Sequence, residues 1–159
     1  FSGAGISDER TTGGKLFVTN TVLKNNKLSN ISIPGAGTSP IAAVLDGLQL
    51  VSSSNGSGLS VAAGNSAIIK NSTIAGNFSN GIVVNTVGTE VLVENCVVSN
   101  NQIGIGIKSG APIIRLSNVV VTKNTTGLSA GSGQILSFGN NKISGNATEN
   151  APTGMISQQ

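Results

Sequence analysis

The chain has 159 residues, of which 38% are hydrophobic and only 9% are charged, and this composition suits one folded domain rather than a disordered chain. No apolar run approaches the ~18 residues that a membrane-spanning helix needs. The net charge of +3 is modest and the basic residues share no common spacing, so the sequence lacks the basic stripe of a nucleic-acid-binding protein. There is no histidine, tryptophan or tyrosine, and the single cysteine, Cys96, excludes an internal disulfide.

The chain divides into three parts according to how well each follows one repeated pattern. Residues 1–15 are rich in glycine and fit the pattern poorly. We predict that they form an N-terminal cap or the edge of a coil, since a repeat array needs an element that covers its open core. Residues 16–146 carry successive copies of the pattern, with a loop at residues 34–40 after the first copy. Residues 147–159 are predicted to be a tail that caps the last copy.

Each copy of the pattern is built around an anchor position, which is asparagine in all copies but one. Apolar residues stand four and two positions before the anchor and three positions after it. A second asparagine stands six positions after it in most copies, and a glycine follows near position ten. The six anchors are Asn20, Gly47, Asn71, Asn95, Asn118 and Asn140. Their spacings of 22 to 27 residues are typical of a solenoid.

Within each copy the apolar residues alternate with other residues, which is typical of β-strands, and no copy has the longer periodicity of a helix. Three short strands in one copy cannot pair with one another, so each must pair in parallel with its counterpart in the next copy, about 4.8 Å away. The predicted fold is therefore all-β: a right-handed parallel β-helix of about six coils, with the hand set by the preference of parallel crossovers. A left-handed helix is the alternative, but its strict six-residue repeat is absent.

The same frame predicts which side chains point inward. Aliphatic and β-branched residues suit these buried strand positions. The residues two before each anchor form one predicted core stack: Val18, Leu45, Ile69, Val93, Leu116 and Phe138. Those three after it form a second: Leu23, Leu50, Ile74, Val98, Val121 and Ile143. A third follows the glycine: Ile31, Leu59, Ile82, Ile105 and Leu128. Cys96 also falls inward, so we interpret it as a small core residue.

The recurring asparagines are predicted to form two ladders at the corners between strands. Asparagine tolerates left-handed backbone angles, and stacked amides can hydrogen-bond along the axis. The first predicted ladder is Asn20, Asn71, Asn95, Asn118 and Asn140. The second is Asn26, Asn77, Asn101, Asn124 and Asn146. Ligands for a sugar are the alternative interpretation, but recurrence in nearly every coil favours a structural role.

The frame Asn-x-x-(Val/Ile)-x-x-Asn, followed by Gly-(Ile/Leu), resembles the repeat of right-handed parallel β-helix proteins, the pectate-lyase-like superfamily. The last copy, residues 137–146, is similar to the closing coil of bacterial members. The resemblance implies the fold over roughly residues 16 to 155. The superfamily includes polysaccharide lyases, glycoside hydrolases, phage tailspikes and adhesins, so the resemblance does not imply one activity.

The best candidate for a catalytic site is a row of charged residues on the outward side of the first strand of each coil. Asp46, Lys70 and Glu94 each stand one position before an anchor and should stack in successive coils, with Arg115 nearby on the same face. A cross-strand ion ladder explains the same alternation of charges and is the favoured interpretation. Without histidine and with only six carboxylates, the sequence contains no recognisable lyase or hydrolase motif and predicts no metal and no cofactor.

The outward positions of the middle copies carry aliphatic residues: Val44, Ile68, Leu92, Val97 and Val120. A contiguous apolar patch usually marks an interface, so we predict that another copy of the chain or a segment outside this sequence covers it. The overall hypothesis is a non-catalytic scaffold or adhesive module, extracellular or on the cell surface. The alternative is a polysaccharide-active enzyme or a carbohydrate-binding remnant of one.

Overall fold

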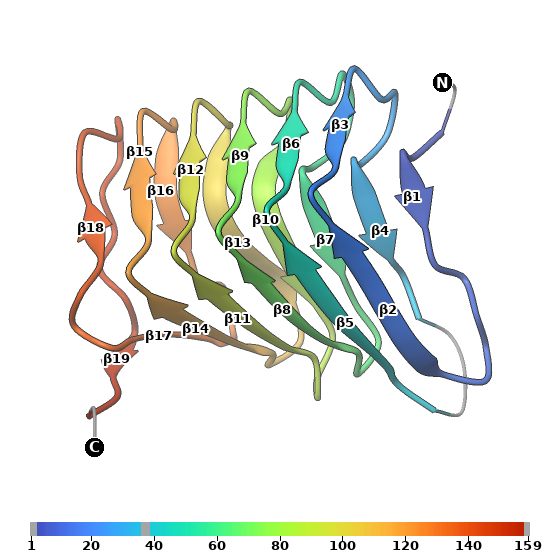
Figure 1. The fold of residues 1–159 in the computed structure, drawn as a ribbon. Helices are drawn as coiled ribbons and strands as arrows, with labels where there is room; N and C mark the ends of the chain where they lie inside the picture. Colours follow the sequence, from blue (N-terminus) through green and yellow to red (C-terminus); the bar gives the residue numbers. More distant parts are fainter. Residues whose placement is uncertain (1–2, 36–38, 158–159) are drawn as a thin grey trace.

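The computed structural model describes residues 3–35 and 39–157, which form nineteen strands and no helix. Figure 1 shows the strands wound into successive coils, with the two chain ends at opposite ends of the solenoid. The strands make three sheets, here called A, B and C, and each sheet takes one strand from each coil. All pairings are parallel. The predicted parallel β-helix is therefore confirmed.

The sheets are ordered along the solenoid axis. Sheet A consists of β1 (Ile6–Ser7), β4 (Ile31–Ile33), β7 (Leu59–Val61), β10 (Asn80–Asn85), β13 (Ile103–Ser109) and β16 (Thr126–Ser129). Sheet B consists of β2 (Gly14–Thr19), β5 (Ile41–Asp46), β8 (Ser66–Lys70), β11 (Glu90–Glu94), β14 (Ile113–Ser117), β17 (Gln134–Ser137) and β19 (Gly154–Met155). Sheet C consists of β3 (Val22–Lys24), β6 (Gln49–Val51), β9 (Thr73–Ala75), β12 (Val97–Ser99), β15 (Val120–Thr122) and β18 (Lys142–Ile143).

The predicted stacks fill the core except at the ends of the solenoid, where Leu23 and Ile143 are only partly buried and Phe138 lies outside it. The stack inside sheet A, which begins at Ile31 and ends at Leu128, is at most 1% exposed throughout. Because neighbouring strands are in register, each inward side chain packs on its counterpart in the next coil and is removed from water on nearly all sides. Cys96 is 1% exposed inside this core, and burial raises the pKa of its thiol to about 11.

The corner between sheets B and C is made by the anchor residues. Asn20, Asn71, Asn95 and Asn118 have positive φ angles of 48–51°, and Gly47 takes the same role with φ 66°. Side-chain amides connect three of them: Asn95 Nδ2 donates to Asn71 Oδ1 at 3.3 Å, and Asn118 Nδ2 to Asn95 Oδ1 at 2.7 Å. This first ladder lies on the surface and is exposed to solvent.

The corner between sheets C and A contains the second ladder, which is buried. The amide Nδ2 of each residue donates to Oδ1 of the next at 2.9–3.0 Å, from Asn77 through Asn101 and Asn124 to Asn146. Each Oδ1 also accepts the backbone N–H of the preceding coil's asparagine. The ladder therefore ties both side chains and backbone of consecutive coils together inside the molecule.

One buried member of this corner, Asn30, falls outside the repeat frame. The second coil has the shorter Ser53 at the ladder position, and Ser53 N donates to Asn77 Oδ1 at 3.1 Å. The amide of Asn30 lies 2.7 Å from that of Asn26 and 2.9 Å from that of Asn77. Asn30, which is 0% exposed, thus bridges the position where the repeat lacks an asparagine.

The predicted register of the last coil is wrong by one residue. Leu116 pairs with Ser137 and Ile114 with Ile135, so Ile135 and Ser137 point inward. Phe138, which the frame placed in the core, therefore faces outward together with Leu136, and Ser137 between them is buried. The coil holds one more residue at its corner than the others, and Gly139 takes the left-handed turn, with φ 85°. Such a shift moves every side chain of a strand to its other face.

Asn140 correspondingly differs from the other anchors. Asn140 Oδ1 accepts the backbone N–H of Asn118 at 3.0 Å, so it extends the first ladder through the backbone. After this coil the chain returns to sheet B, where β19 pairs with β17. At the opposite end β1 pairs with β4, so part of residues 1–15 forms an edge strand of sheet A.

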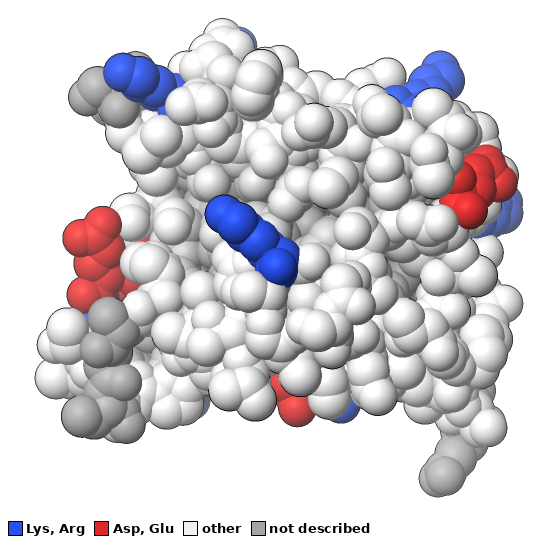
Figure 2. All heavy atoms as spheres, turned by 180° about the vertical axis from the view of Figure 1, so that it is seen from behind, with Lys and Arg blue, Asp and Glu red and all other residues white. Residues whose placement is uncertain are grey.

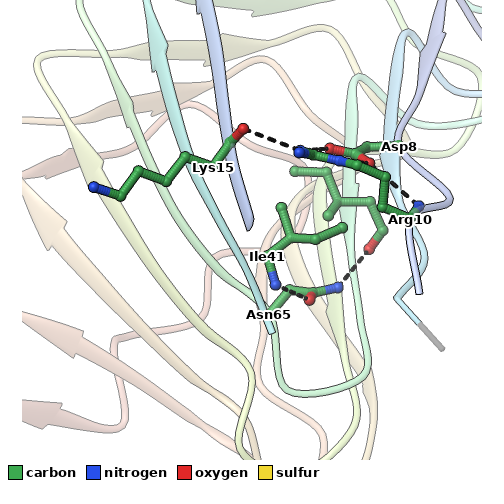
Figure 3. A network of polar contacts seen from close by, with 6 residues as sticks. Asp8, Arg10, Lys15, Ile41 and Asn65 are labelled. Carbon is green, nitrogen blue, oxygen red and sulfur yellow. Dashed lines mark hydrogen bonds and ion pairs between the residues drawn. The ribbon is translucent and has the colours of Figure 1, made fainter. Parts of the chain in front are cut away.

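Two polar clusters close the turns that lead from sheet A into sheet B, and Figure 3 shows them side by side. Asn65, which is 1% exposed, accepts the backbone N–H of Ile41 and donates to Ala62 O, both at 2.7 Å. Arg10 holds the buried Asp8 through Nε–Oδ1 (2.8 Å) and Nη2–Oδ2 (2.5 Å) contacts. Its Nη2 also donates to the carbonyl of Lys15 at 3.0 Å, which joins β1 to β2.

The Asp8–Arg10 pair predicts a pH-dependent contribution to stability. The hydrogen bond from Arg10 holds the pKa of Asp8 below its ordinary value. A depressed folded-state pKa gives stability that is present above the unfolded-state pKa and is lost as the pH falls through the folded-state pKa. Asp8→Asn should therefore unfold more easily than the parent at neutral pH, with the difference shrinking in acid.

Denaturant unfolding at a series of pH values checks this expectation, and the exposed neighbour Glu9→Gln serves as the control. A difference between Asp8→Asn and the parent that stayed constant down to acidic pH would contradict it.

Candidate functional surface

The outer face of sheet B carries three columns of side chains, because each strand contributes three outward residues and the strands are in register. The central column is Phe17, Val44, Ile68, Leu92, Arg115 and Leu136. The column toward sheet C is Thr19, Asp46, Lys70, Glu94 and Ser117. The column on the other side is Lys15, Ala42, Ser66, Glu90, Ile113 and Gln134. Figure 1 views this sheet from outside, with no other described segment in front of β2, β5, β8 and β11.

The first four residues of the central column form an apolar column along the solenoid axis. Phe17 is 66% exposed and Ile68 39% exposed, while Val44 and Leu92 are half-buried by their neighbours. A shallow hollow of about 310 Å³ lies over its middle and is lined by Val44, Ile68, Leu92, Glu90 and Arg115, among others. The apolar column is thus open to solvent over several adjacent strands.

The predicted apolar patch is divided between two sheets. Val44, Ile68 and Leu92 lie on sheet B, but Val97 and Val120 are neighbours on sheet C. The chain turns at the anchor asparagines between these positions, so the five residues do not form one contiguous face. The repeat frame predicted which residues of each strand face outward, but it did not show that the corner places these strands on two separate faces.

The charged residues predicted to stack are brought together in register. Asp46 pairs with Lys70 and Lys70 with Glu94 across neighbouring strands, and Lys70 Nζ lies 3.4 Å from Asp46 Oδ2. Asp46 Oδ1 also accepts a hydrogen bond from Asn71 Nδ2 at 2.9 Å, so the carboxylate extends the surface ladder beyond Asn71 toward the N-terminal coils. This hydrogen bond, aided by Lys70, lowers the pKa of Asp46.

Arg115 binds a different carboxylate. Its Nη1 lies 2.8 Å from Glu90 Oε2, diagonally across β11 and β14. Glu90 was not among the candidate residues, although it stands four positions before Glu94 and therefore shares its outward side. Glu90 stands five positions before the anchor Asn95, and Lys15 stands five positions before Asn20. Including this outward position in the repeat frame would have identified both residues.

A family described as "Right handed beta helix region" matches residues 2–148. The chain belongs to the right-handed β-helix family. The resemblance predicted from the asparagine frame is therefore confirmed. No curated protein and no solved structure matches the chain in the two other comparisons.

In this β-helix the charged cluster is poorly suited to acid–base chemistry. Asp46 and Glu94 are two strands apart, on the order of 10 Å, and Lys70 stands between them. A general acid needs a raised pKa, whereas hydrogen bonding lowers the pKa of Asp46. The alternation of acid, base and acid is instead the arrangement that avoids like charges in neighbouring strands.

The opposite face of the β-helix, over sheet A, has a different character. Figure 2 shows this face almost without charged side chains, apart from one cationic side chain that crosses its middle. The outward residues of sheet A are mostly small: Ser7, Ser32, Ser60, Val83, Gly106 and Ser129. A hollow of about 470 Å³ lies over β1 and β4, and another of about 280 Å³ lies over β10, β13 and β16.

Within the described ranges, no group of three or more histidine, cysteine or carboxylate residues is placed to hold a metal ion. The described residues also include no helix that is long and apolar enough to cross a membrane.

Proposed function

We propose that the protein is a non-catalytic scaffold or adhesive module, secreted or displayed on a cell surface. The observation that carries this proposal is the unbroken ladder from Asn77 to Asn146, buried at its first three members, which ties four coils together by side-chain and backbone hydrogen bonds. Buried, fully paired polar networks rigidify a structure. A rod held in this way offers flat, fixed faces for binding, which is the requirement of a scaffold.

The charges of sheet B support the same proposal. Asp46 is paired with Lys70 and Asn71, and Glu90 with Arg115, so these groups are engaged with one another. Charged pairs at a partly exposed surface stabilise little but fix the spacing and sign of charge that a partner meets. The face is therefore suited to recognition more than to bond cleavage.

One observation favours the alternative, a polysaccharide-active or polysaccharide-binding protein. A hollow of about 320 Å³ on sheet B is lined by Leu92, Glu94, Arg115, Ser117 and Phe138. A cation beside an apolar and aromatic wall is a suitable place for an acidic sugar, since sugar faces pack on rings and carboxylates bind guanidinium groups. Its lining includes one carboxyl group, that of Glu94, whereas acid–base cleavage of a sugar needs two, so the hollow suits binding more than cleavage.

An assay against a panel of acidic polysaccharides, with and without calcium, tests the proposal. We expect no increase in reducing ends or in unsaturated products for the parent protein. Retention on one of the polymers without cleavage, weakened by Arg115→Ala but not by the sheet C control Gln49→Ala, would identify the adhesive ligand. Cleavage abolished by Asp46→Ala or Glu94→Ala and unaffected by the control would overturn the non-catalytic proposal.

A further inference from the structure

We infer that two copies of the chain pair face to face through sheet B, with their solenoid axes antiparallel. The two-fold axis of this dimer runs parallel to the strands and lies between β5 and β8. The inference goes beyond the scaffold proposal and does not depend on which ligand the scaffold binds. It starts from the apolar column, whose residues stand in register on four adjacent strands and include the exposed Phe17 and Ile68. No other described segment lies in front of these strands (Figure 1). Contiguous exposed apolar surface of this kind marks an interface.

The choice of a second copy as the partner rests on the charges that flank the apolar column. A two-fold interface brings the same patch of both copies together, so the patch must be complementary to itself. An axis along the strands keeps each column opposite the same column and reverses the order of the strands. With the axis between β5 and β8, strand β5 faces the partner's β8, and β2 faces the partner's β11.

This arrangement places opposite charges against one another in both flanking columns. Asp46 faces the partner's Lys70, and Lys15 faces the partner's Glu90. Because each contact occurs twice, the two Asp46 and two Lys70 side chains alternate in sign around the axis. In the central column apolar residues meet apolar residues, Val44 against the partner's Ile68 and Phe17 against the partner's Leu92. The register follows directly from the observed pairings of the strands.

Other two-fold arrangements of the same face are less favourable. An axis along the solenoid would set Glu90 against the partner's Glu94. An axis through the middle of β8 would set Lys70 against the partner's Lys70 and Asp46 against the partner's Glu94. Like charges facing each other across an interface are strongly unfavourable. An axis one strand further, between β8 and β11, avoids repulsion but leaves Asp46 and Lys15 facing uncharged residues.

The overlap predicts a weak, reversible dimer. Four strands at about 4.8 Å and five residues at about 3.3 Å cover on the order of 300 Å² of each face in projection. The two faces together cover roughly 600 Å² in projection, which is less than the ~1,000 Å² of a stable interface and is compatible only with a weak contact. Association should therefore be visible only at high protein concentration, and the flanking charges should decide whether it occurs.

Mixing two charge-reversed variants tests the pairing. Asp46→Lys and Lys70→Glu should each weaken self-association at least about tenfold, because each sets like charges opposite one another twice. An equimolar mixture of the two should associate again, because both contacts between positions 46 and 70 then bring opposite charges together. In one contact the two substituted residues meet, and in the other the unchanged Asp46 meets the unchanged Lys70. Effects within one chain cannot produce this recovery on mixing. Sedimentation velocity over a wide concentration range gives the association constants, and circular dichroism checks that each variant is folded.

A second measurement fixes the register. Lys15 and Glu90 are three strands apart in one chain, about 14 Å, too far for a zero-length carbodiimide cross-link. A Lys15–Glu90 cross-link, confined to the dimer band, is expected for the parent. The sheet C variant Val97→Lys should leave both association and cross-link unchanged, whereas Ile68→Lys should abolish them.

Three outcomes would overturn the inference. The first is a parent that stays monomeric at the highest concentration. The second is an Asp46→Lys variant that still dimerises, which would indicate the axis between β8 and β11. The third is a longer form of the protein that stays monomeric and in which carbodiimide does not reach the Glu90 carboxylate, which would mean that a further segment covers the face. None of these results alters the polysaccharide assay, so the two proposals fail independently.

Discussion

Asn101→Ala should lower the free energy of unfolding by about 3–5 kcal/mol, because it interrupts the buried ladder in the middle of the solenoid. Asn101 is 4% exposed. Its Oδ1 accepts both the backbone N–H and Nδ2 of Asn77, and its Nδ2 donates to Asn124 Oδ1 and to the carbonyl of Ser99. Alanine leaves these groups without partners in a site that water does not reach, and each such group costs about 1–3 kcal/mol.

Asn95→Ala provides the matched comparison, because Asn95 belongs to the exposed ladder of the same coil. Water can replace its side-chain hydrogen bonds, and the remaining cost is that of placing alanine at φ 50°, about 1 kcal/mol. Asn95→Gly should be close to neutral, since glycine adopts this angle freely. Denaturant unfolding of the three variants checks the order, and equal losses for Asn101→Ala and Asn95→Ala would show that burial of the second ladder is not what makes it stabilising.

The two ladders looked equivalent in the sequence, since both are asparagines at fixed spacing. What separates them is the backbone path at each corner. At the first corner the asparagine itself takes the left-handed angle and its side chain points to solvent. At the second corner the preceding residue takes that angle, as Asn100 does with φ 55°, and the asparagine turns inward. The repeat predicted where the corners lie but not which of them is buried.

The repeat frame predicted the middle coils well because each strand there is fixed by two neighbours in the same register. At the ends this constraint is weaker. The last coil absorbs an extra residue at Gly139, and its apolar residues change faces, so that Phe138 lies outside and Ser137 inside. The second coil has Ser53 where the repeat expects an asparagine, and Asn30 contacts Asn77 in its place. Asn30 lies 23 positions earlier in the sequence, so the repeat frame did not predict this contact.

The sequence predicted that the charged residues of sheet B align in a column, but it did not predict which of them form ion pairs. The alternation of inward and outward residues placed Asp46, Lys70 and Glu94 in line, and they are in line in the structure. Long side chains, however, choose among neighbours within reach, and Arg115 extends diagonally to Glu90. Diagonal neighbours on a sheet are 7–8 Å apart, within the reach of arginine, so register alone does not decide the partner.

The glycine near position ten of each repeat occurs where the neighbouring coil leaves no room for a side chain. Gly58, Gly81, Gly104 and Gly127 follow the buried ladder in successive coils. A Cβ at Gly104 would lie 2.7 Å from the carbonyl oxygen of Gly127, 2.7 Å from Val121 Cγ1 and 2.9 Å from Asn124 Nδ2. Gly81 has the same surroundings one coil earlier, and Gly58 has them two coils earlier. The coils stack closely at this corner because no side chain separates them.

Gly104→Ala should therefore be among the most destabilising single-methyl changes in the chain, with a loss of about 3 kcal/mol or more in the free energy of unfolding. The added methyl meets backbone on one side and a ladder amide on the other, and neither can move without breaking hydrogen bonds to the next coil.

Gly106→Ala, two residues further along β13, is the matched control. Its Cβ points outward and its nearest neighbour is the Ile103 side chain at 3.2 Å, which can shift by a few tenths of an ångström. Thermal and denaturant unfolding of both variants, with hydrogen exchange at Asn77, Asn101 and Asn124, would locate the damage. A Gly104→Ala protein as stable as Gly106→Ala would mean that the coils can separate at this corner, and the close stacking beside the buried ladder would then not be what the repeated glycine maintains.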